Sequence, residues 1–237
     1  MHDGWVTWSI LARDPATGEL GAAVATKFFA VGALCLRAEG GVGVVATQAL
    51  VNPLLAPRVL DRLRAGGAAE DAVAAVLDAD PGREVRQLHA LGADGRSARR
   101  TGADCVGWCG HLHGTDVSVA GNMLAGPRVV EATLETFRAT TGPMAERLLA
   151  ALDAGQAEGG DKRGRQSAAL LVASRDPYPD LDIRVDDHPD PLTELRRLHG
   201  VAGEHFVHFR RFMAGHDHPG VFDRTVINAA IEKARGG

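Results

Sequence analysis

The chain has 237 residues and a net charge of −4, and its 45% hydrophobic and 24% charged residues are ordinary for a globular protein. This weakly acidic balance gives no reason to expect nucleic acid or an anionic membrane as a partner, and no apolar run approaches the roughly 20 residues of a membrane span. Three cysteines and the lack of an apolar leader segment favour a reduced, cytoplasmic protein.

The first fifty residues predict four strands. Residues 5–12 alternate so that one face is fully apolar, which is typical of a strand packed on a core. Turn residues at 14–18 lead into a second predicted strand at 21–26, so the pair predicts a hairpin. Two further strands are predicted over 31–36 and 41–47.

Groups of helices and strands alternate after this point. Helices are predicted over 52–63 and 68–79. The remaining predictions are strands over 85–91, 97–101 and 116–120, helices over 127–137 and 144–154, strands over 167–173 and 181–185, and helical structure from Pro191 with a break at 215–220. This order predicts an α+β domain over residues 1–190, with two sheets covered by helices on their outer faces. Residues 191–237 would form a helical extension packed on it.

Thr7 lies at the start of the first predicted strand. A threonine becomes a nucleophile when a chain begins with it, because a free α-amine with a pKa of about 8 can act as general base on the hydroxyl of the same residue. Residues 1–6 precede Thr7, so this chemistry requires their removal. Otherwise Thr7 is an ordinary strand residue.

The predicted hairpin brings Lys27 close to Thr7. If Thr7 pairs with Ala25, Lys27 projects from the same face as Thr7 and Ser9. Its positive charge would then lower the pKa of the Thr7 amine and hydroxyl. A register shifted by one residue would instead turn Lys27 to the other face, as a strand-end lysine in solvent.

Polar residues gather where predicted strands meet loops or helices. Asn122 could cap the following helix or hydrogen-bond a substrate carbonyl. Thr47 and Gln48 end another strand, where backbone N–H groups can stabilise an oxyanion. The loop before the strand at 167–173 is typical either of an active-site rim or of a solvated loop. Its polar residues are Asp161, Arg163, Gln166 and Ser167.

Three segments carry side chains that can bind metal. The first contains Cys105, Cys109, His111 and His113. Zn²⁺ accepts such ligands, but their spacing departs from the CxxC knuckle, and structural cysteines beside exposed histidines explain them as well. The segments 216–218 and 186–188 are explained equally by a polar interhelical loop and by a strand-to-helix turn. We predict no bound metal or cofactor and keep a zinc-assisted hydrolase as an alternative.

Short motifs recur in an order that resembles one known family. They are Thr7-Trp8-Ser9-Ile10-Leu11-Ala12-Arg13-Asp14-Pro15, Ala25-Thr26-Lys27-Phe28, Gly32-Ala33, Ala46-Thr47-Gln48-Ala49, Thr101-Gly102-x-x-Cys105, Gly121-Asn122-Met123-Leu124, Gly160-Asp161-x-Arg163-Gly164-x-Gln166-Ser167-Ala168-Ala169 and Arg184-Val185-Asp186-Asp187-His188. Over roughly residues 7–198 they resemble a bacterial family of unknown function placed in the N-terminal nucleophile (Ntn) hydrolase superfamily. The resemblance implies a four-layer αββα sandwich like that of proteasome subunits.

The resemblance also implies roles for particular residues. Thr7 is similar in position to the strand-initial threonine nucleophile of proteasome subunits, and Lys27 falls where those subunits carry a charged active-site residue. Thr47-Gln48 looks like the strand end whose backbone N–H supplies the oxyanion hole. The groups that would support or orient the threonine amine are Gly121-Asn122, Asp161 and Ser167. Arg37, near the end of the next predicted strand, could compete with Lys27 for the charged role.

We therefore expect an Ntn-type amidohydrolase or peptidase that cleaves a small amide or peptide, with Thr7 as nucleophile after residues 1–6 are removed. The expected catalytic residues are Thr7, Lys27, Asp161 and Ser167, and the expected oxyanion- or substrate-binding residues are Thr47, Gln48, Asn122, Ser9, Arg163 and Gln166. The alternatives are a non-catalytic binding or assembly protein that keeps the leader, and the zinc-assisted hydrolase. The apolar hairpin and the helical extension could support a homodimer.

Overall fold

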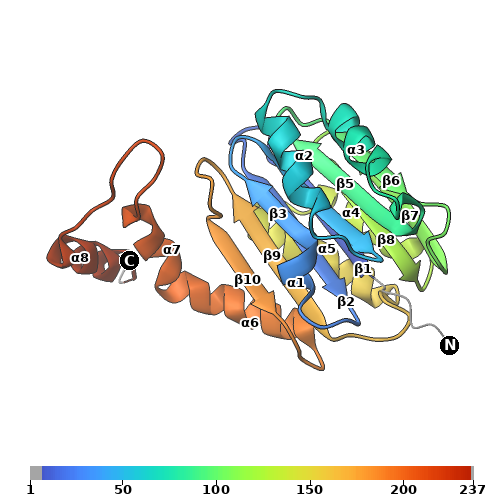
Figure 1. The fold of residues 1–237 in the computed structure, drawn as a ribbon. Coiled ribbons are helices and arrows are strands. Elements are labelled where there is room, and N and C mark those ends of the chain that lie inside the picture. Colours follow the sequence, from blue (N-terminus) through green and yellow to red (C-terminus); the bar gives the residue numbers. More distant parts are fainter. Residues whose placement is uncertain (1–6, 236–237) are drawn as a thin grey trace.

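The computed structural model describes residues 7–235, and the strands in this part of the chain form two antiparallel sheets (Figure 1). The six-stranded sheet has the order β10-β9-β2-β1-β8-β7, and the four-stranded sheet has the order β3-β4-β5-β6. The strands are β1 (Thr7–Arg13), β2 (Leu20–Thr26), β3 (Leu36–Glu39), β4 (Gly43–Ala49), β5 (Arg86–Gly92), β6 (Ser97–Thr101), β7 (Trp108–Gly114), β8 (Val117–Leu124), β9 (Ser167–Ala173) and β10 (Leu181–Val185). The mixed α+β class is confirmed.

Helices cover the outer faces of both sheets. The helices of the described residues are α1 (Val31–Cys35), α2 (Leu55–Arg64), α3 (Ala69–Asp78), α4 (Arg128–Ala139), α5 (Met144–Ala157), α6 (Pro191–Glu204), α7 (Phe206–Phe209) and α8 (Arg224–Arg235), with 3₁₀ turns η1 (Arg83–Val85) and η2 (Arg210–Phe212). Helix α1 packs in the layer between the sheets. Figure 1 shows α2 and α3 on the four-stranded sheet and α4 and α5 on the six-stranded sheet. No helix within residues 7–235 is both long and apolar enough to cross a bilayer.

The alternation along the strands builds three apolar layers. On β1, Trp8 and Ile10 pack toward α4 and α5, while Leu11 packs toward the four-stranded sheet. A third cluster lies between the four-stranded sheet and helices α2 and α3. Each large side chain buried in these layers stabilises the fold by about 1.5–3 kcal/mol. The layer between the two sheets also contains buried polar side chains, among them Ser9, Gln48 and His89.

The segment 31–36 was predicted as a strand, and this prediction is wrong for Val31–Cys35, which form helix α1. Ala30 has a φ of 53°, which turns the chain into the helix, and the Ser167 hydroxyl accepts the Val31 N–H at 3.1 Å. Gly32 lets the helix approach β9, because a Cβ there would lie 2.4 Å from the Ala169 Cβ. These contacts come from distant parts of the chain, so local alternation did not indicate them.

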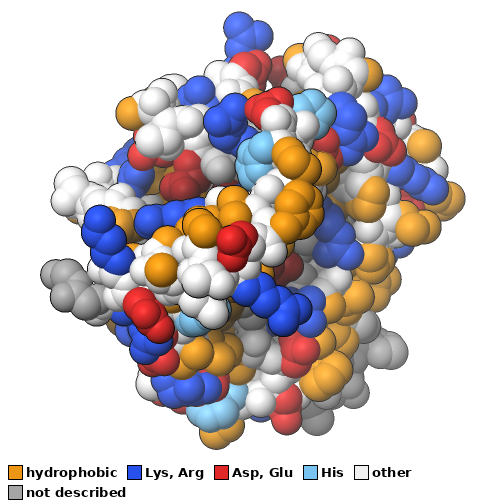
Figure 2. Space-filling model, turned by 90° about the vertical axis from the view of Figure 1, so that its left-hand side faces the viewer, with side chains coloured by type: hydrophobic (Ala, Val, Ile, Leu, Met, Phe, Trp, Pro, Cys, Tyr) orange, Lys and Arg blue, Asp and Glu red, His pale blue; other side chains and the backbone are white. Residues whose placement is uncertain are grey.

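The C-terminal tail leaves the sheets after α6. Helix α6 packs on the core through Leu192 and Leu195, whereas α7 and α8 lie to one side of both sheets (Figure 1). The tail leaves large apolar side chains in solvent, and Phe222 is 81% exposed. Viewed from this side, apolar side chains gather among charged ones (Figure 2). A homodimer through this tail stays a prediction.

Candidate active site

Several predicted site residues lie at strand ends that meet at one end of the two sheets. Thr7, which opens β1, pairs with Thr26 at the end of β2 and with Asn122 near the end of β8. Thr26 pairs in turn with Ser167, which opens β9. From the other sheet, the Gln48 side-chain amide donates to the Thr7 carbonyl at 3.3 Å. The fold thus brings together residues that are far apart in the sequence.

The predicted register of the first hairpin is wrong by one residue. Thr7 pairs with Thr26 and not with Ala25, and its hydroxyl donates to the Thr26 hydroxyl at 3.3 Å. Lys27 therefore does not share the face of Thr7. Its side chain is exposed, and Nζ donates to the Arg165 carbonyl at 3.2 Å.

Asp161 is buried and holds the loop at residues 160–166 against the end of β2. Its carboxylate accepts the Lys27 backbone N–H at 2.6 Å and the Arg163 backbone N–H at 2.9 Å. The Arg163 guanidinium also forms an ion pair with it at 3.0 Å. None of these contacts reaches Thr7. They support a positioning role for Asp161 and Arg163 in this loop, and the role expected for Asp161 toward the Thr7 amine stays a prediction.

Ser167 and Gln166 also bind groups outside the Thr7 residue. The Ser167 hydroxyl donates to the Phe28 carbonyl at 2.5 Å, in addition to accepting the Val31 N–H. The Gln166 side chain donates to the Asp187 carboxylate at 3.0 Å on the surface. Both residues fasten the start of β9 to neighbouring loops.

Neutral polar side chains cross the layer between the sheets. Gln48 Oε1 accepts the Ser9 hydroxyl at 2.6 Å, and Gln48 Nε2 donates to Gln87 Oε1 at 2.7 Å as well as to Thr7. Gln87 Nε2 donates onward to the Thr101 hydroxyl and to the Gly121 carbonyl, both at 2.9 Å. Both N–H groups of Gln48 are therefore in use, and its side chain has no donor left for an oxyanion.

His89 was not predicted as a site residue, yet it lies between two buried serines. Its Nε2 is 2.8 Å from the Ser9 hydroxyl and its Nδ1 is 2.9 Å from the Ser118 hydroxyl. Because Ser9 gives its only proton to Gln48, His89 Nε2 must donate to Ser9, and Ser118 must donate to Nδ1. His89 is thus no general base for Ser9. Ser9 and His89 are the residue types of a catalytic serine–histidine pair, but the direction of their hydrogen bond is the reverse of the one that catalysis requires.

Burial lowers the pKa of His89 from 6.5 to about 3, and His111 nearby adds to the shift. Between about pH 6 and pH 3 the unfolded chain binds a proton that the folded chain does not, so the free energy of unfolding falls as pH falls. The loss from this residue is about 1.4 kcal/mol per pH unit. We expect His89→Gln to weaken this pH dependence in urea unfolding measured from pH 7 to pH 4. The surface variant His205→Gln is the control, and a parallel loss in all three proteins would contradict the assignment.

Asn122 has one buried atom without a partner. Its Nδ2 donates to the Thr7 carbonyl at 3.3 Å and to Gln87 Oε1 at 3.2 Å, so a flipped amide would set oxygen against oxygen. Its Oδ1 accepts no hydrogen bond within residues 7–235, although the residue is 1% exposed. A buried acceptor in this state costs about 1–3 kcal/mol unless a donor reaches it.

A small cavity adjoins Asn122. Its volume is about 130 Å³, and its other walls are Ala49, Leu50, Val85, Asp104, Cys105 and Val106. Backbone strain occurs beside it, because Ala49 has a φ of 67° and Met123, the residue after Asn122, has a φ of 48°. Alkyl side chains in this left-handed region cost about 1–3 kcal/mol, and such strain concentrates at functional sites. The cavity and the start of β1 at Thr7 form the candidate active site.

Thr47 contributes no side chain to this site. Its hydroxyl donates to the Asn52 carbonyl at 3.3 Å, and the alternation of β4 directs it to the face opposite Gln48. Only the backbone at the end of β4 remains as a candidate for oxyanion binding.

The four residues of the zinc alternative do not converge. The Cys105 thiol donates to the Arg86 carbonyl at 3.4 Å, and His111 Nδ1 is 3.1 Å from the Thr101 hydroxyl. Burial, with Cys109 nearby, raises the pKa of the Cys105 thiol to about 11, which disfavours a thiolate ligand. Within residues 7–235, no three His, Cys, Asp or Glu side chains are grouped as a metal site requires. The zinc alternative is therefore wrong in its geometry.

A family model described as "family of unknown function (DUF1028)" matches residues 7–195. The chain belongs to the DUF1028 family. Among solved structures, the DUF1028 protein SPO2555 from Silicibacter pomeroyi is 35% identical, with a TM-score of 0.85, over 92% of this chain and 96% of that chain. No curated protein matches the sequence.

A second solved structure, Anbu (ancestral beta-subunit) from Yersinia bercovieri, is 12% identical with a TM-score of 0.40, over 82% of this chain and 94% of that chain. An identity and a TM-score this low say nothing about the function of this chain. The DUF1028 match begins at Thr7 and ends within α6, so it includes both sheets and the candidate site. The tail formed by α7 and α8 lies outside it.

Proposed function

We propose that this DUF1028 protein is an Ntn-type amidohydrolase that cleaves a small amide or peptide, with Thr7 as nucleophile once residues 1–6 are removed. The proposal rests mainly on Asn122 Oδ1, a buried acceptor without a described donor, on the residue paired with Thr7. The free α-amine of a chain that begins at Thr7 is a donor of the required kind.

The proposed reaction uses the amine of Thr7 as its base. The amine takes the proton of the Thr7 hydroxyl, Oγ1 attacks the substrate carbonyl, and a tetrahedral oxyanion forms. The C–N bond then breaks, the leaving amine takes the proton, and water hydrolyses the remaining acyl ester. Because Gln48 and Asn122 have already donated their N–H groups, backbone N–H groups at the end of β4 would stabilise the oxyanion. Lys27 has no part in this scheme.

The fold supports the same assignment. Two packed antiparallel sheets carry helices on both outer faces, and β1 begins at the end where the polar strand ends meet. We propose that this is the four-layer αββα sandwich of Ntn hydrolases. The strained residues Ala49 and Met123 beside the cavity are a further sign of a functional site.

Intact-mass spectrometry of the active protein tests whether Thr7 becomes the first residue. We expect the active species to lack residues 1–6 and to give threonine in the first cycle of N-terminal sequencing. Amide hydrolysis by a protein that still carries Met1 to Val6 would exclude the free-threonine mechanism.

A non-catalytic binding protein is the second candidate, and the state of Thr7 favours it. The Thr7 side chain and carbonyl already have internal partners, and the residue is 4% exposed. This candidate predicts that the leader stays attached and that Thr7→Ala changes neither ligand affinity nor any activity, as isothermal titration calorimetry and amide turnover would show.

A further inference from the structure

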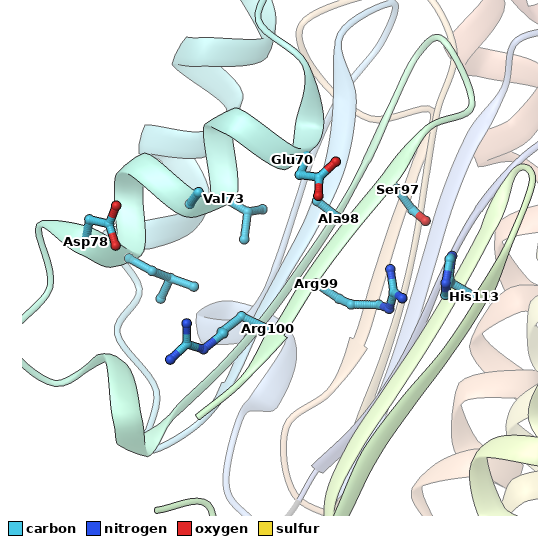
Figure 3. A pocket seen from close by; sticks show the side chains of 10 residues that line it. Glu70, Val73, Asp78, Ser97, Ala98, Arg99, Arg100 and His113 are labelled. Carbon is cyan, nitrogen blue, oxygen red and sulfur yellow. The ribbon is translucent and has the colours of Figure 1, made fainter. Parts of the chain in front are cut away.

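A second pocket lies along the edge strand β6. Its volume is about 400 Å³, and it lies between α3, β6 and the nearby strand β7 (Figure 3). Strand β6 supplies Ser97 to Arg100, β7 supplies His113, and α3 supplies apolar and acidic side chains. None of these residues takes part in the proposed hydrolysis.

Arg99 is the unusual residue of this pocket. Its side chain makes no hydrogen bond and no ion pair within residues 7–235, and its Nε atom is buried without a partner. Figure 3 shows its guanidinium directed from β6 toward His113 on β7. The next residue, Arg100, extends to the side of α3 and forms an ion pair with Glu84 at 3.0 Å. Two adjacent arginines therefore differ in whether their charge is compensated.

The charge of Arg99 acts on the two histidines beside it. After burial, the charge of Arg99 is the next cause that lowers the pKa of both His111 and His113. Guanidinium groups bind oxyanions through two parallel, charge-assisted hydrogen bonds. An anion bound at Arg99 would satisfy the buried Nε and offset the charge of the guanidinium.

The rest of the pocket indicates which anion it would accept. Val73, Ala74 and Leu77 give α3 an apolar wall, which suits an aliphatic group. Glu70 and Asp78 lie on the same helix and would repel a ligand with several negative charges. The combination favours one negative charge at one end of an apolar body.

We propose that this pocket binds a small aliphatic monocarboxylate, with the carboxylate on Arg99 and the alkyl chain along α3. The site is separate from Thr7, and the proposal holds whether or not Thr7 is catalytic.

Isothermal titration calorimetry with hexanoate tests the proposal on the full chain. We expect saturable binding of hexanoate, weaker binding of acetate, and at least tenfold weaker hexanoate binding by Arg99→Gln, because a charge-assisted contact is lost. The matched variant Arg100→Gln, on the same strand but already paired with Glu84, should bind within about twofold of the native chain. Circular dichroism spectra of both variants show whether they are folded.

Two further measurements separate this site from weak, unspecific binding. Hexanol has the same chain without the charge and should not compete with hexanoate. In NMR titrations, saturating hexanoate should raise the pKa of the His113 imidazole, because the bound charge compensates Arg99. Absence of hexanoate binding, equal losses in both arginine variants, or an unmoved His113 titration would each overturn the proposal.

Discussion

Replacing Thr7 with alanine is expected to abolish amide hydrolysis and any self-cleavage before residue 7, while the protein still folds. The variant loses the proposed nucleophile, and losses of a thousandfold or more in turnover are usual when a nucleophile is removed. The structural loss is small, because the Thr7 hydroxyl makes one hydrogen bond of 3.3 Å, to Thr26. A bond of this kind contributes about 1 kcal/mol. Turnover of a panel of small amides and peptides, with intact-mass spectrometry, measures both effects.

Thr7→Ser is the matched control for this experiment. It keeps a hydroxyl at the same position, so it should retain measurable hydrolysis and cleavage. Unchanged turnover in Thr7→Ala would remove Thr7 from the mechanism and leave the non-catalytic candidate. Loss of activity in both variants with retained folding would point to a requirement for the threonine methyl group in packing beside Thr26, and not to nucleophilic catalysis.

Gln87→Leu is expected to lower the free energy of unfolding by roughly 3–5 kcal/mol. The leucine has a similar volume, but it deprives Gln48 and Asn122 of the acceptor that their amides share. It also leaves the Gly121 carbonyl without the donor that Gln87 supplies. Each of these groups lies in an interior layer without access to bulk water, so the loss exceeds that of one hydrogen bond. Urea unfolding at pH 7, followed by tryptophan fluorescence, measures the change.

The same substitution at Gln166 is the control. Its side chain donates to Asp187 in an exposed setting, so Gln166→Leu should change the free energy of unfolding by less than about 1 kcal/mol. If the two leucine variants lose similar stability, the network between the sheets does not have the role assigned to it.

Local patterns predicted much of the fold. The strands at 97–101, 167–173 and 181–185 have the predicted bounds, because alternation and flanking turn residues are properties of the segment itself. Ser167 opens one of these strands, and Thr7 lies near the start of another predicted strand. Asn122 was predicted to follow the strand at 116–120, but it lies within β8. The proximity of these three residues was expected from the family resemblance and is confirmed by the pairing of their strands.

The partners of individual side chains were not predictable in the same way. The observed register of the first hairpin differs by one residue from the predicted one, so Lys27 lies on the other face of the sheet from Thr7. The turn sequence does not specify this register. Gln87 and His89 lie in a correctly expected strand, and their alternation with Leu88 and Ala90 was the available signal. That alternation indicates that Gln87 and His89 lie on the same face of the strand. Several of their hydrogen-bond partners belong to the other sheet, and the packing of the two sheets decides which residues these are.

The hydrogen bonds among the buried amides of Gln48, Gln87 and Asn122 predict how these positions vary together within the family. Each amide satisfies two neighbours at once, so a change at one position removes a donor or an acceptor that the others need. Relatives that differ at one of these three positions should therefore differ at another as well. Residues 48, 87 and 122 are therefore expected to covary across the two sheets, even in relatives whose cavity-lining residues differ.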